Sequence, residues 1–206
     1  MIAILDYGVG NLFSLRSSFR AIGAEAAVTA DPAVIARADR LVLPGVGAFR
    51  DAAEKLRASG LDRILLSEAK AGKPLLGICL GMQLLFESSS EYGEHPGLGL
   101  LPGHVTGMAG RIPPELKIPH IGWNALHITR MHPLLSNIRE GDCVYFVHSF
   151  FAADCDASTI AVTDYGIPVT AAVARGSVMG CQFHPEKSGA VGLAILRAFC
   201  ETEVFS

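Results

Sequence analysis

One cysteine in this sequence stands where a nucleophile would be expected. Cys79 is the centre of the motif Gly77-Ile78-Cys79-Leu80-Gly81, where an apolar run changes from a strand-like to a helix-like pattern. Glycines two positions to either side leave room for a tight turn between the two elements. A helix beginning at Leu80 would point free N–H groups and its positive end at the sulfur, which favours the reactive thiolate. Without this context Cys79 would be a small core residue; with it, we predict a nucleophile.

A base for this thiol is available in the segment CQFHPEKS, residues 181–188. Pro185 disfavours a helical backbone at the preceding residue and so keeps His184 extended. In an extended segment residues i and i+2 point to the same side, so His184 and Glu186 share a face. Glu186 can then accept a hydrogen bond from one imidazole nitrogen and leave the other for the sulfur. Alone, His-Pro-Glu would indicate only a solvated turn after a strand; together with Cys79 it predicts a Cys-His-Glu triad.

A glycine-rich segment, LVLPGVGAF at 41–49, could complete such a site. Gly45 and Gly47 can bring a backbone N–H close to an oxygen on which negative charge develops. The N–H of Leu80, directly after the nucleophile, would be the second donor. The alternative for this segment is an ordinary turn between a strand and a helix.

The elements that must position these residues follow from the hydrophobic pattern. In the first half, apolar runs alternate with segments of helical spacing, as in sheets of parallel strands joined by right-handed crossovers. In the second half, strand-like segments follow one another through short turns, which predicts an antiparallel β elaboration. We therefore expect one α/β domain over residues 1–206, with a mostly parallel central sheet and helices on both faces. Strands are expected at 1–6, 24–29, 40–45, 74–79, 103–108, 121–129, 143–150, 159–166, 169–176 and 177–184, and helices at 11–23, from 32, at 48–72 with a break near Gly60, at 80–87 and at 189–201.

Composition disfavours several classes of protein. Half of the 206 residues are hydrophobic and 18% are charged, which is typical of a folded globular protein. The longest apolar stretch, 74–86, is interrupted by glycines and is shorter than the ~18 residues of a membrane span. A net charge of −3 without a Lys/Arg run argues against nucleic-acid binding. Five cysteines without a Cys-x-x-Cys pair argue against a disulfide framework and a zinc site, and we expect no metal or cofactor. The opening residues MIAILD lack the basic segment of a signal peptide, so we expect a cytoplasmic protein.

With these parts placed, the chain resembles the class I, triad-type glutamine amidotransferases. Within that family it is most similar to the glutaminase subunits of imidazole glycerol phosphate synthase in histidine biosynthesis. The cysteine turn and His-Pro-Glu mark the broad family. The motifs that point to the glutaminase subunits are DYGVGN (6–11), PGVGAF (44–49), PHIGWN (119–124) and FHPEKS (183–188).

The resemblance implies hydrolysis of glutamine to glutamate and ammonia through a glutamyl thioester. Cys79, His184 and Glu186 match the family's catalytic triad. His148 would have only a structural role. Gln83, one helical turn past the nucleophile, faces the same way as Cys79. The positions that would bind glutamine and its oxyanion are Gly45, Gly47, Leu80, Gln83, Ser149 and Phe150, the last two mainly through their backbone groups.

The resemblance also implies a partner. In this family the ammonia passes to a cyclase subunit with a (β/α)8 barrel fold, which makes imidazole glycerol phosphate and AICAR; the two subunits form a heterodimer. A further hypothesis is that the Gly45–Val46 peptide turns its N–H away from the oxyanion until the cyclase is occupied. Residues expected to face the cyclase are Tyr7, Asn11, Trp123, Tyr145 and Lys187.

Three alternatives remain at the level of sequence. The chain could be the glutaminase subunit of another pathway, such as anthranilate, GMP, carbamoyl phosphate or pyridoxal phosphate synthesis, although PHIGWN and DYGVGN speak against this. A cysteine peptidase or stress protein of related fold would not be expected to carry His-Pro-Glu after a strand near the C-terminus. An inactive regulatory subunit would not need an intact triad.

Overall fold

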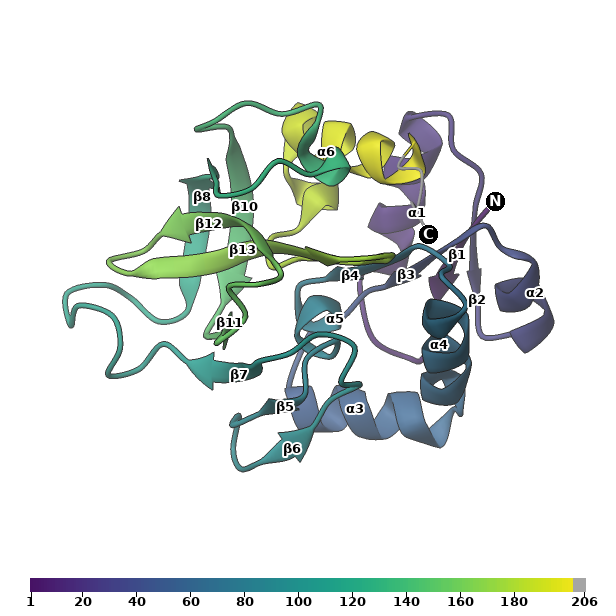
Figure 1. Ribbon diagram of the computed structural model, residues 1–206, viewed down its shortest axis with the longest axis horizontal. Coiled ribbons are helices and arrows are strands. Elements are labelled where there is room, and N and C mark those ends of the chain that lie inside the picture. The colour runs from purple at the N-terminus through teal and green to yellow at the C-terminus, as the bar shows by residue number, and fades with distance from the viewer. Residues whose placement is uncertain (202–206) are drawn as a thin grey trace.

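A long mixed sheet forms the centre of the protein. The computed structural model describes residues 1–201, and within them the central sheet has eight strands in the order β2-β1-β3-β4-β14-β13-β12-β9 (Figure 1). The strands are β1 Ile2–Leu5, β2 Ala26–Thr29, β3 Arg40–Leu43, β4 Leu75–Ile78, β9 His127–Ile128, β12 Thr159–Asp164, β13 Pro168–Arg175 and β14 Val178–Cys181.

The two halves of this sheet differ in direction. β1, β2, β3, β4 and β14 pair in parallel, and β13, β12 and β9 add antiparallel strands beyond β14. The prediction of a mostly parallel sheet with an antiparallel elaboration is confirmed. One detail differs, because β14, expected among the antiparallel segments, pairs in parallel with β4 and so belongs to the parallel half.

Helices cover both faces of the sheet, as predicted. The strands alternate in the face they present: Ala3 and Leu5 pack with the core that includes Phe49, whereas Ile2 and Ile4 pack with the core that includes Phe19. In Figure 1, α1 and α6 lie above the sheet and α3, α4 and α5 below it. The helices are α1 Leu12–Ala21, α2 Pro32–Arg37, α3 Phe49–Ala58, α4 Leu61–Lys70, α5 Leu80–Gln83 and α6 Gly189–Glu201.

Several helix boundaries follow from the residues that the sequence places there. Asn11 caps α1, because its side chain accepts a hydrogen bond from the N–H of Ser14. Asp31 caps α2 in the same way through the N–H of Ala33. Gly60 separates α3 from α4 with a φ of +73°, so the predicted break in the segment 48–72 is confirmed.

The helix after Cys79 is shorter than the sequence predicts. It covers only Leu80–Gln83 instead of 80–87, because the hydrogen bonds after Gln83 no longer follow the α-helical pattern. The N–H of Phe86 donates three residues back to Gln83 at 3.2 Å, and the N–H of Glu87 donates to the carbonyl of Gly103 at 3.1 Å. The short 3₁₀ turns at Pro133–Leu135 and Pro185–Lys187 were not predicted either.

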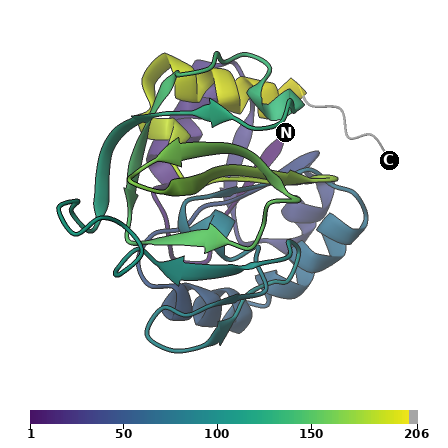
Figure 2. The same ribbon diagram turned by 60° about the vertical axis from the view of Figure 1, so that its left-hand side comes forward.

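Two smaller sheets lie beside the antiparallel end of the central sheet, on the side that Figure 2 turns forward. One pairs β10 with β8, and the other has the order β11-β7-β5-β6. The predicted strand at 143–150 therefore divides between β10 and β11, and the one at 121–129 between β8 and β9. The bounds are β5 Ser88–Ser89, β6 His95–Pro96, β7 His104–Gly107, β8 His120–Ala125, β10 Cys143–His148 and β11 Phe150–Ala153.

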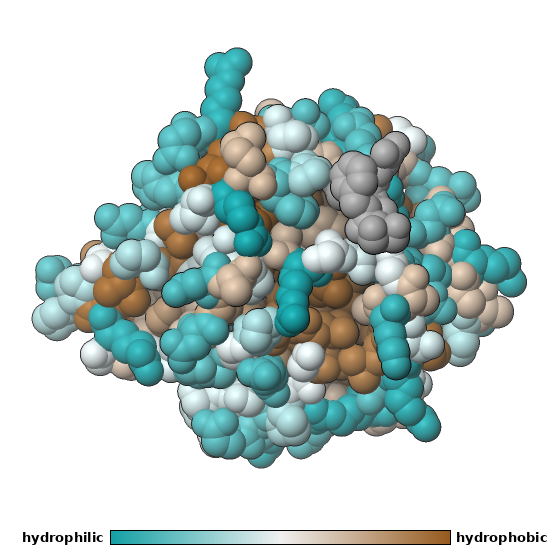
Figure 3. Space-filling model, viewed as in Figure 1, coloured by the Kyte–Doolittle hydropathy of each residue, from teal (hydrophilic) through white to brown (hydrophobic). Residues whose placement is uncertain are grey.

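The helices are short, and much of the surface in Figure 3 is hydrophilic. None of the helices in residues 1–201 is long and apolar enough to cross a membrane. On the face shown in Figure 3, hydrophilic side chains surround smaller areas of hydrophobic residues.

Candidate active site

Cys79 occupies a strained turn between β4 and α5. Its φ of 55° and ψ of −114° lie in a region that residues with a side chain rarely adopt. Hydrogen bonds on both sides hold this conformation. The Cys79 N–H donates to the carbonyl of Cys181 on β14 at 2.8 Å, and the Cys79 carbonyl accepts from the N–H of Gln83 at 3.1 Å. The sharp turn from strand to helix that the sequence predicts is therefore present.

The two glycines beside Cys79 are required by close packing of backbone. A Cβ at Gly77 would lie 2.7 Å from the carbonyl oxygen of Gly81. A Cβ at Gly81 would lie 1.8 Å from the carbonyl oxygen of Leu43, at the end of β3. The turn is thus wedged against the neighbouring strand. Gly45, two residues after Leu43, packs against the same turn, because a Cβ there would lie 2.5 Å from the backbone nitrogen of Gly81.

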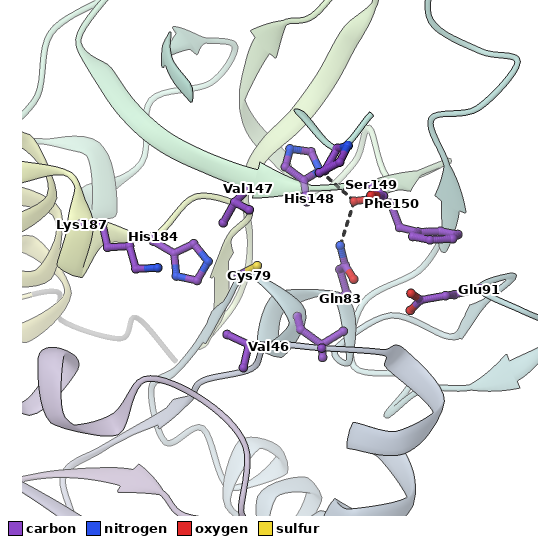
Figure 4. A pocket seen from close by; sticks show the side chains of 13 residues that line it. Val46, Cys79, Gln83, Glu91, Val147, His148, Ser149, Phe150, His184 and Lys187 are labelled. Carbon is purple, nitrogen blue, oxygen red and sulfur yellow. Dashed lines mark hydrogen bonds between the residues drawn. The ribbon is translucent and has the colours of Figure 1, made fainter. Parts of the chain in front are cut away.

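His184 and Glu186 lie together beside Cys79. His184 is extended, with φ −99° and ψ 98°, and its Nδ1 is 2.8 Å from Glu186 Oε1. Figure 4 shows the ring beside the sulfur of Cys79. The side chains of His184 and Glu186 are each only 3% exposed. The main chain of His184 is fixed by Tyr145, whose carbonyl accepts its N–H at 2.9 Å.

The charge state of His184 is set by competing effects. Burial lowers its pKa, but the hydrogen bonds and charges of Cys79 and Glu186 outweigh burial and raise the pKa to about 9. At neutral pH the ring is therefore an imidazolium between two groups that stabilise its proton. A cysteine beside a histidine that is oriented by a carboxylate is an arrangement used for nucleophilic catalysis.

A pocket of about 380 Å³ opens at this cysteine. Figure 4 shows the side chains around it. Of the residues predicted to bind substrate, Gly45 is not part of the wall and instead packs behind it. The lining residues are Val46, Gly47, Cys79, Leu80, Gln83, Glu91, Pro119, Val147, His148, Ser149, Phe150, His184 and Lys187.

Glu91 is a pocket residue that sequence reasoning missed. Its carboxylate accepts a hydrogen bond from the N–H of Phe49 at 2.7 Å, and its side chain lies across the pocket from Cys79 (Figure 4). Among the described lining residues it is the only acidic one. No sequence motif indicates this residue. It lies in the connection between β5 and β6, and long-range contacts set the path of that connection.

The amide of Gln83 is held by the protein itself. Its Nε2 donates to the carbonyl of Phe150 and to Gln182 Oε1, both at 2.9 Å. Gln182 Nε2 in turn donates to the sulfur of Cys79 at 3.8 Å. Gln83 therefore has its amide nitrogen committed to the pocket wall, and the oxygen is the atom left for a ligand.

Of the residues expected at a partner interface, four reach the surface. Trp123 is 55% exposed and packs edge-on against Tyr145, with ring centroids 6.1 Å apart. The Lys187 ammonium lies 5.8 Å from the centre of the Tyr145 ring. Asn11 is exposed at the start of α1.

Tyr7 differs from the other four. It is 6% exposed, and its hydroxyl donates to the carbonyl of Pro44 at 2.6 Å. Burial, and secondarily the charge of Cys79, raise the pKa of Tyr7 well above its usual range. This arrangement leaves little of the side chain for a partner. It favours a role in holding the segment that leads into Gly45.

The residues described contain no group of three or more His, Cys, Asp or Glu side chains that could hold a metal ion.

Comparisons with known proteins agree with this geometry. Residues 3–202 match the family described as glutamine amidotransferase class-I. The chain is 51% identical over 203 residues to the imidazole glycerol phosphate synthase subunit HisH of Syntrophotalea carbinolica, covering 97% of this chain and 98% of that protein. It is 49% identical to the protein of the same name from Geobacter metallireducens, covering 96% of each.

Solved structures show the same fold at low identity. A crystal structure of a glutamine amidotransferase matches with a TM-score of 0.76 at 19% identity, covering 97% of each chain. PurLQS from Thermotoga maritima matches with a TM-score of 0.73 at 18% identity, again covering 97% of each. The chain therefore belongs to the class I glutamine amidotransferase family, in the branch that holds the HisH subunits of imidazole glycerol phosphate synthase.

Proposed function

We propose that this protein hydrolyses L-glutamine to L-glutamate and ammonia and supplies the ammonia to imidazole glycerol phosphate synthesis in the histidine pathway. The observation that carries this proposal is the site at Cys79. A strained cysteine, an imidazolium and a buried carboxylate meet there at a pocket large enough for one amino acid. Relatives that are about half identical over nearly their whole length bear the name of a synthase subunit.

The triad performs acyl transfer. The Cys79 thiolate attacks the carbon of the side-chain amide, and the carbonyl oxygen becomes an oxyanion. His184 gives its proton to the amide nitrogen, the C–N bond breaks, and ammonia leaves a glutamyl thioester on the sulfur. His184, now neutral, takes a proton from water, and the resulting attack on the thioester releases glutamate and restores the thiolate. Glu186 keeps the ring oriented at 2.8 Å and stabilises its charged form.

Backbone N–H groups would stabilise the oxyanion by donating hydrogen bonds to it. The N–H of Leu80 follows the nucleophile directly, and the Gly45–Gly47 segment offers the second donor. We also propose that the N–H of the Gly45–Val46 peptide turns toward the oxyanion only when the cyclase subunit has its ligand bound. Val46 is 44% exposed on the pocket rim, where a partner could reach it.

The amino-acid end of glutamine is bound at the opposite side of the pocket. Glu91 places a carboxylate where the α-ammonium group would lie. The backbone of Ser149 and Phe150 and the free oxygen of Gln83 complete the polar contacts. A carboxylate at Glu91 and a nucleophile at Cys79 in one pocket would suit an α-amino acid whose side chain ends in an amide.

The partner we propose is a cyclase subunit with a (β/α)8 barrel fold, which forms a heterodimer with this chain. It would consume the ammonia to make imidazole glycerol phosphate and AICAR. Trp123, Tyr145, Lys187 and Asn11 would face it, because they lie at the surface and Lys187 also lines the pocket. A role in the anthranilate, GMP, carbamoyl phosphate or pyridoxal phosphate pathway is less consistent with the relatives' names.

Replacing the nucleophile tests the proposed chemistry. We expect Cys79→Ser to lower glutamate release by about 10³-fold or more, because a hydroxyl is not ionised by this imidazolium. Glutamate is measured with glutamine as substrate and the cyclase subunit present. Cys143→Ser changes an exposed free cysteine and is the matched control, expected to keep wild-type turnover. Equal turnover in Cys79→Ser and the wild type would rule the mechanism out.

A second experiment tests the anchor for the α-ammonium group. We expect Glu91→Gln to raise the KM for glutamine by about tenfold or more while kcat falls less, because the lost charge contacts a part of the substrate that does not react. Glu94→Gln, an exposed neighbour on the same connection, is the control and should keep the wild-type KM. An unchanged KM in Glu91→Gln would contradict the assignment.

The raised pKa of His184 predicts a particular dependence of activity on pH. His184 must be protonated to give a proton to the leaving amide nitrogen. Because it loses this proton as the pH rises through about 9, kcat/KM should fall there. Glu186→Gln removes the negative charge that helps to raise the pKa and should move this alkaline limb to lower pH. A limb that stays in place in Glu186→Gln would show that the carboxylate does not act on His184.

A further inference from the structure

Two buried histidines connect the pocket to β8. His148 ends β10 and is 7% exposed, whereas His120 begins β8 and is 1% exposed. The two residues pair directly across the antiparallel strands. His148 Nε2 lies 3.1 Å from His120 Nδ1. The mechanism derived above uses neither ring, so their burial needs another explanation.

The inner end of this connection is the carbonyl of Phe150. His148 Nδ1 is 2.9 Å from that oxygen, and Gln83 Nε2 donates to the same oxygen at 2.9 Å, as the dashed lines in Figure 4 show. A carbonyl oxygen can only accept, so His148 carries a proton on Nδ1. Burial lowers the pKa of His148 to about 3, which keeps the ring neutral. Its Nε2 then carries no proton and faces the ring of His120.

The outer end is held by packing. The His120 ring stacks on Tyr165 and on Phe146, with centroid separations of 4.0 and 4.9 Å. Its Nε2 lies 2.8 Å from Asn124 Oδ1, farther along β8. These contacts fix the plane of His120, whose ring packs edge-on against that of His148 with centroids 5.0 Å apart. His148 is therefore held with its own donor aimed at Phe150.

We propose that His148 is a positioning residue for glutamine, kept in its donor orientation by His120. By holding the carbonyl of Phe150, it sets the backbone of Ser149 and Phe150 and the amide of Gln83 around the substrate. It acts through these groups and not on the reacting atoms. This inference rests on the proposed function, because glutamine is the ligand that it positions.

Two substitutions that keep different halves of the imidazole test this role. Asparagine can place an N–H near the position of Nδ1, whereas glutamine places its amide near that of Nε2. We expect His148→Gln to raise the KM for glutamine by about tenfold with a smaller change in kcat, because Phe150 loses a buried donor. His148→Asn should stay within about threefold of the wild type. His127→Gln, at an exposed hydrogen-bonded histidine on β9, is the matched control.

The kinetics are measured on the full chain with the cyclase subunit bound, and a second measurement does not depend on turnover. Calorimetry of glutamine binding to Cys79→Ser, with and without each change at His148, should give the same order of affinities. If the wild type releases no glutamate, the proposed function fails, while the binding data still decide the role of His148. Equal affinity in the two His148 variants, or a lower melting temperature with unchanged affinity, would overturn the inference.

Discussion

The site depends on one backbone constraint, the wedge of the Cys79 turn between the ends of β3 and β4. Gly81 touches the carbonyl of Leu43 so closely that no side chain fits, and Gly77 and Gly45 are confined in the same way. This packing holds Cys79 at a positive φ and keeps its sulfur at the mouth of the pocket. The strain of the turn is local, but long-range contacts with the neighbouring strand maintain it.

The pairing of β14 with β4 supplies the second half of the site. Because the strands run in parallel, with Cys181 opposite Ile78, the chain leaves β14 beside the nucleophile. His184 follows three residues later, and Tyr145 and Ser188 anchor its backbone. A nucleophile and a base that are far apart in the sequence thus line the same pocket without a dedicated loop. The antiparallel strands then close the pocket from the other side with Ser149 and Phe150.

Local signals explain what the sequence could predict. Some patterns can be interpreted from a few neighbouring residues. They are the glycines around Cys79, the extended His-Pro-Glu segment and the alternation of strands and helices. The sheet, the helices on both faces and the sharp turn at Cys79 were therefore predictable. Glu91, the capture of the Gln83 amide by Phe150 and Gln182, the burial of Tyr7 and the short α5 were not. Each depends on a contact between segments that are far apart in the sequence, and no local pattern shows that these segments meet. His148, expected to be structural, illustrates the same limit, because its partners lie on β8 and beyond β10.

The charge of His184 gives the most direct test of the proposed mechanism. A nuclear magnetic resonance titration of ¹⁵N-labelled histidine, with the His184 signals assigned by their loss in His184→Gln, reports the protonation of this ring in the intact chain. We expect an imidazolium that persists through neutral pH and titrates at about 9, and a lower pKa of His184 in Cys79→Ser. A His184 that titrates at or below the ordinary histidine value of about 6.5 would contradict it.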